Sequence, residues 1–275
     1  MRTFVSAVFG LLAVLLTAAA FCGAWLNTNV VSENGFAALG EPLARDEAFQ
    51  RELATALSAE AVGAVDVPAP LASVVEPLIT SAVEQVQTMP EYPEAWSETL
   101  RRSHALTFGD AAEGTSAALT LDVAPLVSLV TGSVGNELSV DVPAVEQVPV
   151  EIGGAGHAEL MRNAERAGEA WPVLALAAAV AGLLALLAAR RRSTTFALIG
   201  LGVALAGGVL WLGAGRLPGQ VSAQQFSSPV ASAFAEAFAG EAAASLHTWT
   251  IGLMLAGAAA FVAGMLARAL RGSRR

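Results

Sequence analysis

The sequence predicts a mainly α-helical membrane protein. It has four transmembrane helices and a mostly helical (α+β) extracytoplasmic domain inserted between the first and the second. Hydrophobic residues make up 55% of the 275 residues, above the roughly 45–50% of soluble globular domains. Four apolar runs each approach the about 20 residues that a helix needs to cross a bilayer. Arginines cluster beside these runs, and most acidic residues lie between the first and the second.

The two middle spans, residues 171–190 and 194–214, form a predicted hairpin with three arginines, 190–192, at its turn. Short positively charged loops are retained in the cytoplasm. The turn is therefore predicted to be cytoplasmic. This places both chain termini in the cytoplasm and residues 27–170 outside it, as expected for a multi-pass protein of the plasma membrane.

The first span, residues 1–26, carries Arg2 at its start and is predicted to be a signal anchor. Ala18–Ala20 resembles a signal-peptidase site, but the apolar run continues through Leu26, which favours an uncleaved anchor. N-terminal sequencing of the mature protein decides between the two. The last span, residues 247–270, precedes a short cytoplasmic tail, 271–275, that is rich in arginine.

Residues 215–246 are predicted to be an extracytoplasmic loop with an amphipathic helix, because Phe226, Val230, Phe234 and Phe238 recur every four residues. That helix either packs against the domain or the spans, or lies in the lipid interface. The tryptophans support this topology, because indole rings favour the headgroup region. Four of the five fall at the predicted outer ends of the spans: Trp25, Trp171, Trp211 and Trp249.

The predicted domain, residues 27–170, is strongly acidic. Between residues 27 and 169, 22 acidic residues stand against six arginines, a formal charge of about −16, which argues against nucleic-acid binding. Helical periodicity and capping residues predict four helices first. The first is capped by Ser32 or Asn34 and ends near Leu43. The second starts at Asp46 and has Phe49, Leu53, Leu57 and Ala61 on one face. The third covers 71–87 and the fourth 93–108.

The second half of the domain has a different pattern. Alternating residues predict a strand over 117–123. The following segments are predicted as a short helix over 124–131, strands over 138–142 and 148–152, a hinge at 153–156 and a helix over 157–169.

The spans contain no Asp, Glu, Lys, Arg or His within 172–189, 194–213 or 248–267, which argues against a secondary transporter acting alone. Instead, small residues recur at helical spacing. They either let these helices pack closely in the bundle or dock another membrane subunit. The residues are Gly252, Ala256, Ala260 and Gly264, with Gly202 and Ala206 in the third span.

No catalytic, cofactor-binding or metal-ligating residues are predicted. Cys22 is the only cysteine, so an intramolecular disulfide is impossible. His104 and His157 lack the spacing of a metal motif. His104 shares a helix face with Trp96, which favours a structural role. Ser103 and His104 with Asp110 lack the nucleophile elbow of a hydrolase.

Arg101 and Arg102 with Trp96 either bind an anionic headgroup or polymer, or are solvated or paired with nearby Glu94 and Glu98. The second interpretation is the favoured one.

The segments "WLNTNVVSENGFAALGEPLARDEAFQRELATALSAEAV", "MPEYPEAWSETLRRSHALTFG" and "LTLDVAPLV" resemble a group of integral membrane proteins from Actinobacteria. The resemblance covers about Trp25–Arg192 and includes Phe49, Trp96 and His104. It implies a cell-envelope protein with an external domain, and it implies no activity or catalytic residues.

The leading hypothesis is a non-enzymatic envelope protein whose outer domain binds a partner protein or an envelope component. A protein partner or a homo-oligomer in the membrane is expected, and no cofactor. The alternative is an accessory subunit of a membrane transport complex. An envelope enzyme acting on lipid or wall precursors is less favoured, because only His247, Glu241 and His157 are polar groups that could reach the outer membrane face.

Overall fold

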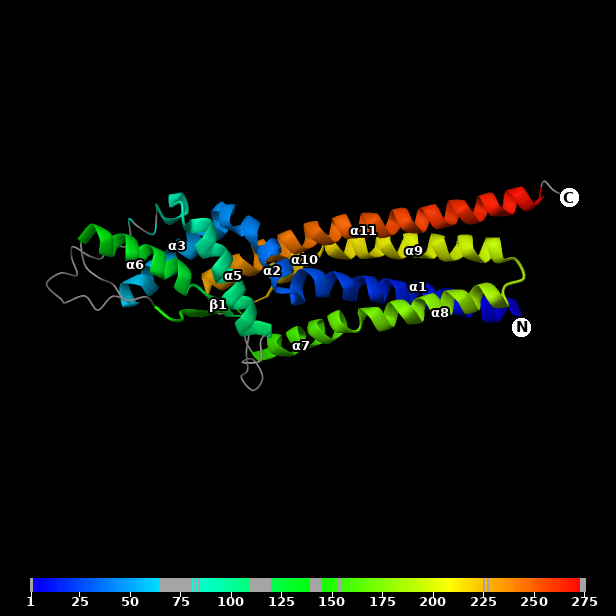
Figure 1. The fold of residues 1–275 in the computed structure, drawn as a ribbon, viewed down its shortest axis with the longest axis horizontal. Helices are drawn as coiled ribbons and strands as arrows, with labels where there is room; N and C mark the ends of the chain where they lie inside the picture. Colours follow the sequence, from blue (N-terminus) through cyan, green and yellow to red (C-terminus); the bar gives the residue numbers. More distant parts are fainter. Residues whose placement is uncertain are drawn as a thin grey trace. The chain divides into compact units, whose positions relative to one another are not determined.

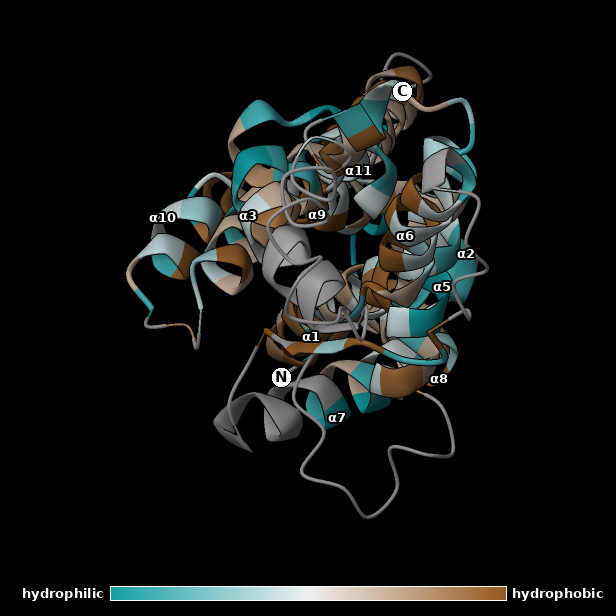
Figure 2. Cartoon of the chain, turned by 90° about the vertical axis from the view of Figure 1, so that its left-hand side faces the viewer, coloured by the Kyte–Doolittle hydropathy of each residue, from teal (hydrophilic) through white to brown (hydrophobic). Residues whose placement is uncertain are grey.

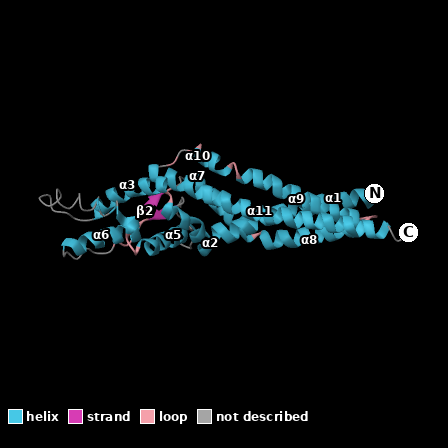
Figure 3. Ribbon diagram, turned by 90° about the horizontal axis from the view of Figure 1, so that it is seen from above, coloured by secondary structure: helices cyan, strands magenta, loops and turns pink. Residues whose placement is uncertain are grey.

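The computed structural model describes residues 2–64, 81, 83, 85–108, 120–138, 145–152, 155–224, 226 and 228–272. The described residues are mainly helical (Figure 3). They form two compact units. Unit 1 comprises Met1–Val31, Asn163–Leu217 and Ala242–Arg275, and unit 2 comprises Ser32–Arg162 and Pro218–Glu241.

Unit 1 is built on the four apolar helices that the sequence predicts, which run side by side in Figure 1. Each is long and apolar enough to cross a membrane. Most of their large apolar side chains point outward, an arrangement that is stable in lipid and unfavourable in water. The chain is therefore a multi-pass membrane protein. The helices are α1 (Arg2–Leu26), α8 (Trp171–Ala188), α9 (Arg192–Ala214) and α11 (Pro229–Gly272), the last from Ala242 onward.

Arginines gather at one end of unit 1. Arg2 begins α1, and Arg190–Arg192 form the turn between α8 and α9. The start of α1 meets the end of α8, where the Ser6 hydroxyl donates to the Ala185 carbonyl at 2.8 Å. The predicted grouping of charges at the hairpin turn is thus present.

Tryptophans gather at the other end of unit 1. The Trp25 indole donates to the Ser245 hydroxyl at 3.2 Å, and Trp249 lies edge-on to Phe21 with ring centroids 6.1 Å apart. Trp171 begins α8, and Trp211 lies one turn before the end of α9. The four tryptophans thus lie toward the same end of unit 1, where Trp171 and Trp211 are exposed and Trp25 is buried.

Helices α9 and α11 approach so closely that only glycine fits at several contacts. A Cβ on Gly257 would lie 2.5 Å from the Ala204 amide nitrogen, and one on Gly200 would lie 2.6 Å from the Phe261 amide nitrogen. Backbones that touch in this way gain dispersion energy along the whole contact.

The predicted series of small residues in α11 is only partly at this contact. Gly264 packs against Ala197 of α9, where a Cβ would lie 2.7 Å from the amide nitrogen. Gly252 and Ala256, however, are exposed. The reason is that the contact follows Gly257, and neighbouring positions on a helix differ by about 100°. Gly202 packs against α1 instead.

In unit 2, two side-chain caps start the first helices. The Ser32 hydroxyl accepts from the Gly35 amide at 3.0 Å and begins α2 (Glu33–Gly40). Ser32, rather than Asn34, is therefore the cap. A 3-10 helix, η2 (Glu41–Arg45), follows. The Asp46 carboxylate accepts from the Phe49 amide at 2.8 Å and begins α3 (Glu47–Ala64), as predicted.

Most of the predicted 71–87 helix lies outside the described residues. Within it, Ser81, Val83 and Gln85 are helical, and the 3-10 turn η3 (Val86–Thr88) follows. The next predicted helix is confirmed as α5 (Tyr92–Phe108).

The predicted strands at 117–123 and 148–152 form a two-stranded antiparallel sheet. Within the described residues the strands are β1 (Thr120–Asp122) and β2 (Pro149–Glu151), and Leu121 pairs with Val150. The helix between them, α6 (Ala124–Leu138), is longer than predicted because its buried stripe continues. Leu138, predicted to begin a strand, is helical, and residues 139–144 lie outside the described part. The stripe is Leu126, Val127, Val130 and Val134.

The last elements change two predicted boundaries. Helix α7 (Ala155–Glu169) takes in part of the predicted hinge, whose residues 153–154 lie outside the described part. After α10 (Leu217–Ser222), α11 runs from Pro229 without a break. The predicted amphipathic helix and last span are therefore one helix, and no Gly or Pro interrupts residues 241–251.

The core of unit 2 includes residues from α11. Phe234 lies 5.7 Å from Phe49 between ring centroids, and Phe238 lies 5.1 Å from Phe36. Of the two interpretations of the amphipathic helix, packing within the folded chain is the one the structure supports. Residues 218–241, predicted as a separate loop, thus belong to the same unit as 32–162.

Candidate functional site

Helix α5 has one buried face and one exposed face. It begins at Tyr92 with Pro93 in its first turn, where the missing amide proton has no cost. Its solvent-facing stripe, called the ridge below, consists of the exposed Glu94, Arg101 and Arg102 and the half-buried Ser97 and Glu98. Hydrophilic positions along α5 are teal in Figure 2. The buried stripe is Tyr92, Trp96, Thr99, Leu100, Ser103 and Thr107.

Side-chain hydrogen bonds hold the buried face of α5 in place. The Trp96 indole donates to the Gly40 carbonyl at 2.9 Å. The Tyr92 hydroxyl donates to the Gln50 side-chain oxygen at 2.8 Å, and the Gln50 amide donates to the Leu43 carbonyl at 2.8 Å. Burial raises the pKa of Tyr92 to about 12. These bonds connect α5 to α2, η2 and α3.

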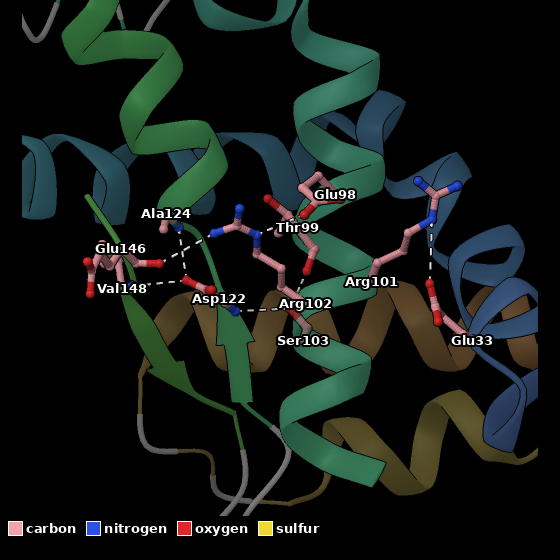
Figure 4. A network of polar contacts seen from close by, with 10 residues as sticks. All are labelled: Glu33, Glu98, Thr99, Arg101, Arg102, Ser103, Asp122, Ala124, Glu146 and Val148. Atoms are coloured by element: carbon pink, nitrogen blue, oxygen red, sulfur yellow. Dashed lines mark hydrogen bonds and ion pairs between the residues drawn. The ribbon is translucent and has the colours of Figure 1, made fainter. Parts of the chain in front are cut away.

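A second set of bonds joins α5 to the sheet and to α6 (Figure 4). The Ser103 hydroxyl donates to the Thr99 carbonyl and accepts from the Asp122 amide at 2.9 Å. The buried Asp122 carboxylate accepts from the amides of Ala124 at 3.1 Å and Val148 at 2.9 Å. Asp122 thereby caps α6 and fixes the segment leading into β2.

This network gives Ser103 a structural role. Ser103 is 1% exposed, and its hydroxyl both donates to and accepts from backbone groups. Asp110, the third member of the imagined triad, lies outside the described residues. The hydroxyl is therefore satisfied by backbone hydrogen bonds inside the core.

The two ridge arginines point to opposite sides of α5 (Figure 4). Arg102 pairs with Glu98 at 2.9 Å and donates to the Glu146 carbonyl at 3.3 Å. Arg101 lies 3.7 Å from Glu33 of α2. These side chains are about half exposed, and such surface pairs contribute roughly 0–1 kcal/mol. They can therefore be exchanged for pairs with a partner at little cost.

Each side of the ridge has a groove. The first, of about 790 Å³, lies between α5 and the segment from α2 to the start of α3. Charged groups at its edge include Arg45, Glu47 and Arg101, and Tyr92 and Trp96 line its inner part.

The second groove, of about 650 Å³, lies between α5 and the start of α6 and is lined by Glu91, Pro125 and Leu129 together with ridge residues. Ser97 and Arg101 line both grooves. The arrangement is a charged ridge between two hollows on a helix whose opposite face is fixed in the core. Its polar groups can bind a ligand or partner by ion pairs and hydrogen bonds.

Two of the three predicted histidines, His104 and His247, lie in different units. In unit 2, His104 packs against Phe36 and Phe108 at 5.6 and 4.9 Å between ring centroids, which agrees with its predicted structural role. In unit 1, His247 packs against Trp211 with the ring centroids 4.8 Å apart and the rings tilted by 32°, and its Nε2 lies 3.1 Å from the Trp211 carbonyl oxygen.

Of the other proposed enzyme residues, Glu241 lines a separate groove with Asp46 and Glu52, and the side chain of His157 lies outside the described part. Glu241 belongs to unit 2, whereas His247 belongs to unit 1. Within the described ranges, no group of three or more His, Cys, Asp or Glu residues could hold a metal ion.

The sequence indicated Arg101 and Arg102 as candidate residues and left open whether they bind an anionic ligand or pair with nearby acidic residues. Trp96 is 1% exposed, so it offers no ring face beside the arginines. Arg102 pairs with Glu98 as predicted, whereas the partner of Arg101 is Glu33, far away in sequence. The grooves depend on the placement of α2 and α6 beside α5, for which local periodicity gives no signal.

Comparison with known protein families, with curated protein sequences and with solved structures finds no match. The resemblance to actinobacterial membrane proteins therefore stays a prediction. The function has to be argued from the residues themselves.

Proposed function

We propose that the chain is a non-enzymatic integral membrane protein of the cell envelope, whose unit 2 lies outside the cytoplasm and binds a partner protein or an envelope component. The ridge on α5 and its two grooves are the binding surface. The spans anchor this surface in the plasma membrane.

The orientation follows from charge. Apart from Arg166 in α7 and Arg216 before α10, the arginines of unit 1 lie at the hairpin turn, at the start of α1 and at the C-terminal end of the chain, where the positive-inside rule favours the cytoplasm. Residues 1–32 and 242–275 contain no Asp or Glu. Unit 2 holds nearly all of the acidic residues, which is compatible with translocation across the membrane.

The observation that carries the binding proposal is the contrast between the two faces of α5. Trp96 and Leu100 are each 1% exposed, so the helix is held firmly. Arg101 and Arg102, on the other side, make only half-exposed ion pairs. A helix that is already fixed, and whose surface ion pairs can be replaced by pairs with a partner, is a favourable binding surface. Little conformational entropy is lost when the partner binds.

The test places a photo-reactive amino acid at Ser97 of the full chain and irradiates the native membrane. Thr55 is the matched control, because it is an exposed residue on another helix of unit 2. A discrete adduct at Ser97 and none at Thr55 supports the proposal, and mass spectrometry identifies the partner. Adducts of equal yield at both positions, or none at either, would contradict it.

A charge reversal sharpens the test. Arg101→Glu is expected to lower the adduct yield at Ser97 several-fold, because it repels whatever pairs with the ridge. Arg51→Glu, on an exposed part of α3, is expected to leave the yield unchanged. If the adduct is a permease or an ATPase subunit, the chain is an accessory subunit of a transport complex.

A further inference from the structure

Unit 1 has a groove between α1 and α9 that was not predicted from the sequence. It has a volume of about 330 Å³ and an almost entirely apolar lining along its length, at the low end of the about 300–1,000 Å³ of small-molecule sites. Its polar groups, Thr3, Ser6 and Thr195, lie on the first turns of the two helices. Val14 and Gly202 line its other end.

The polar end of the groove is the arginine end of unit 1. Arg2 immediately precedes Thr3, and Arg191 and Arg192 precede Thr195 by one helical turn. The Thr195 amide donates to the Arg191 carbonyl at 3.1 Å. All three arginines are exposed.

These positive charges have no acidic counterpart nearby in the sequence. Residues 1–32, 170–235 and 242–275, which supply all four apolar helices of unit 1, contain no Asp or Glu. Uncompensated arginines at a membrane surface attract anionic lipid headgroups.

The length of the groove indicates the kind of occupant. From Thr3 to Val14 an α-helix rises about 16 Å, roughly half of the about 30 Å hydrocarbon core of a bilayer. The close approach at Gly202, where a Cβ would lie 2.7 Å from a Val14 methyl carbon, closes the inner end. A partner helix would need a groove across the whole bilayer, whereas an acyl chain of one leaflet needs half.

We propose that this groove is a site for an anionic phospholipid. One acyl chain lies between α1 and α9, and the phosphate lies among Arg2, Arg191 and Arg192. Thr3 and Thr195 supply hydroxyls at the level of the glycerol backbone.

The test measures lipid binding to the purified full chain by native mass spectrometry. Phosphatidylglycerol and phosphatidylcholine with identical acyl chains are compared. Phosphatidylglycerol is expected to bind on the order of 100-fold more, because each of the three arginines near the headgroup contributes about five-fold. Equal binding of the two lipids by the unaltered protein would overturn the proposal, and this result depends on no variant.

Two variants separate the groove from the charges. Ala7→Phe places a ring in the groove, which Ala7 lines, and is expected to lower phosphatidylglycerol binding about ten-fold or more, because each displaced CH₂ costs about four-fold. Ala263→Phe, on an exposed position of α11, is the matched control and is expected to bind as the unaltered protein does. Equal loss in both variants would contradict a site in the groove.

The double variant Arg191→Gln and Arg192→Gln tests the headgroup. It is expected to lower the preference for phosphatidylglycerol about 25-fold and to leave phosphatidylcholine binding unchanged. A preference that survives this change would contradict the assignment of the phosphate to these arginines.

Discussion

The two units are packed by different means. In unit 1, helices α9 and α11 touch through glycines, and a Cβ on Gly257 would meet the neighbouring backbone at 2.5 Å. In unit 2, large side chains fill the core, with Phe49 5.5 Å from Trp96 and 5.7 Å from Phe234 between ring centroids.

The difference follows from the solvent that each unit is built for. In water, burying a large apolar side chain stabilises the fold by about 1.5–3 kcal/mol. In lipid that gain is absent between helices, because the lipid tails are as apolar as leucine, and close backbone packing takes its place. The same chain therefore has glycine at the contacts of one unit and aromatic rings at the contacts of the other.

The largest expected effect is the loss of an aromatic side chain from unit 2. Trp96→Ala is expected to destabilise unit 2 by about 3–5 kcal/mol, because it opens a cavity and removes the bond to the Gly40 carbonyl. Guanidinium unfolding of the detergent-solubilised chain measures this. Leu205→Ala, at a 64% exposed position of α9, is the control with almost no expected effect, and equal losses would contradict the comparison.

The next largest loss of stability is expected at Asp122, whose carboxylate accepts two hydrogen bonds from backbone amides. Asp122→Ala is expected to cost about 1–3 kcal/mol, because the buried amides of Ala124 and Val148 lose their acceptor. Asp122→Asn retains an oxygen and is expected to cost less. Hydrogen exchange at the start of α6 checks this, and unchanged protection in the alanine variant would show that the cap is dispensable.

In unit 1, adding a side chain to a glycine at the contact of α9 and α11 is expected to destabilise the helix packing. Gly257→Val is expected to cost about 1–3 kcal/mol, because overpacking forces α9 and α11 apart. Gly252→Val, one and a half turns away on the same helix with nothing within 4 Å of its Cβ, is the matched control. Unfolding in sodium dodecyl sulfate, followed by circular dichroism, compares them. A larger loss at Gly252 would place the contact on the other face of α11.

The smallest effect is that of the Tyr92 hydroxyl. Tyr92→Phe is expected to cost about 1 kcal/mol at neutral pH, because the Gln50 oxygen loses its donor. At alkaline pH the order of stability of the unaltered protein and Tyr92→Phe is expected to reverse. The folded pKa of about 12 exceeds the ordinary value near 10, so the folded state holds the proton more tightly than the unfolded state.

The stabilisation from that proton is fully present below pH 10 and is lost as the pH rises to about 12, by about 1.4 kcal/mol per pH unit. Urea unfolding at several pH values is expected to show this decline for the unaltered protein and not for Tyr92→Phe. Parallel declines would mean that another group is responsible.

The sequence predicted what local patterns determine. The four apolar helices follow from their length, and the caps at Ser32 and Asp46 follow from residue type. The length of α6 was underestimated because the prediction ended the helix at Thr131, although Val134 continues its buried stripe. The continuity of α11 was missed because a change from amphipathic to apolar pattern was interpreted as a boundary.

The candidate site was less predictable. The alternating pattern over 117–123 gave no signal that Asp122 is buried, because Asp is rarely buried unless it is paired or hydrogen-bonded. Its burial depends on amides from α6 and from the segment before β2, which only the folded chain brings together. The groove at α1 and α9 likewise depends on two segments nearly 200 residues apart.

The most direct test of the account determines on which side of the membrane unit 2 and the arginine-rich end of unit 1 lie. Ala105→Cys on α5 and Ala269→Cys near the end of α11 are both exposed, and each is made with Cys22 replaced by serine. A membrane-impermeant maleimide is expected to label Ala105→Cys in intact cells and Ala269→Cys only after permeabilisation. Labelling of Ala269→Cys alone in intact cells would contradict the account, because it would place unit 2 in the cytoplasm.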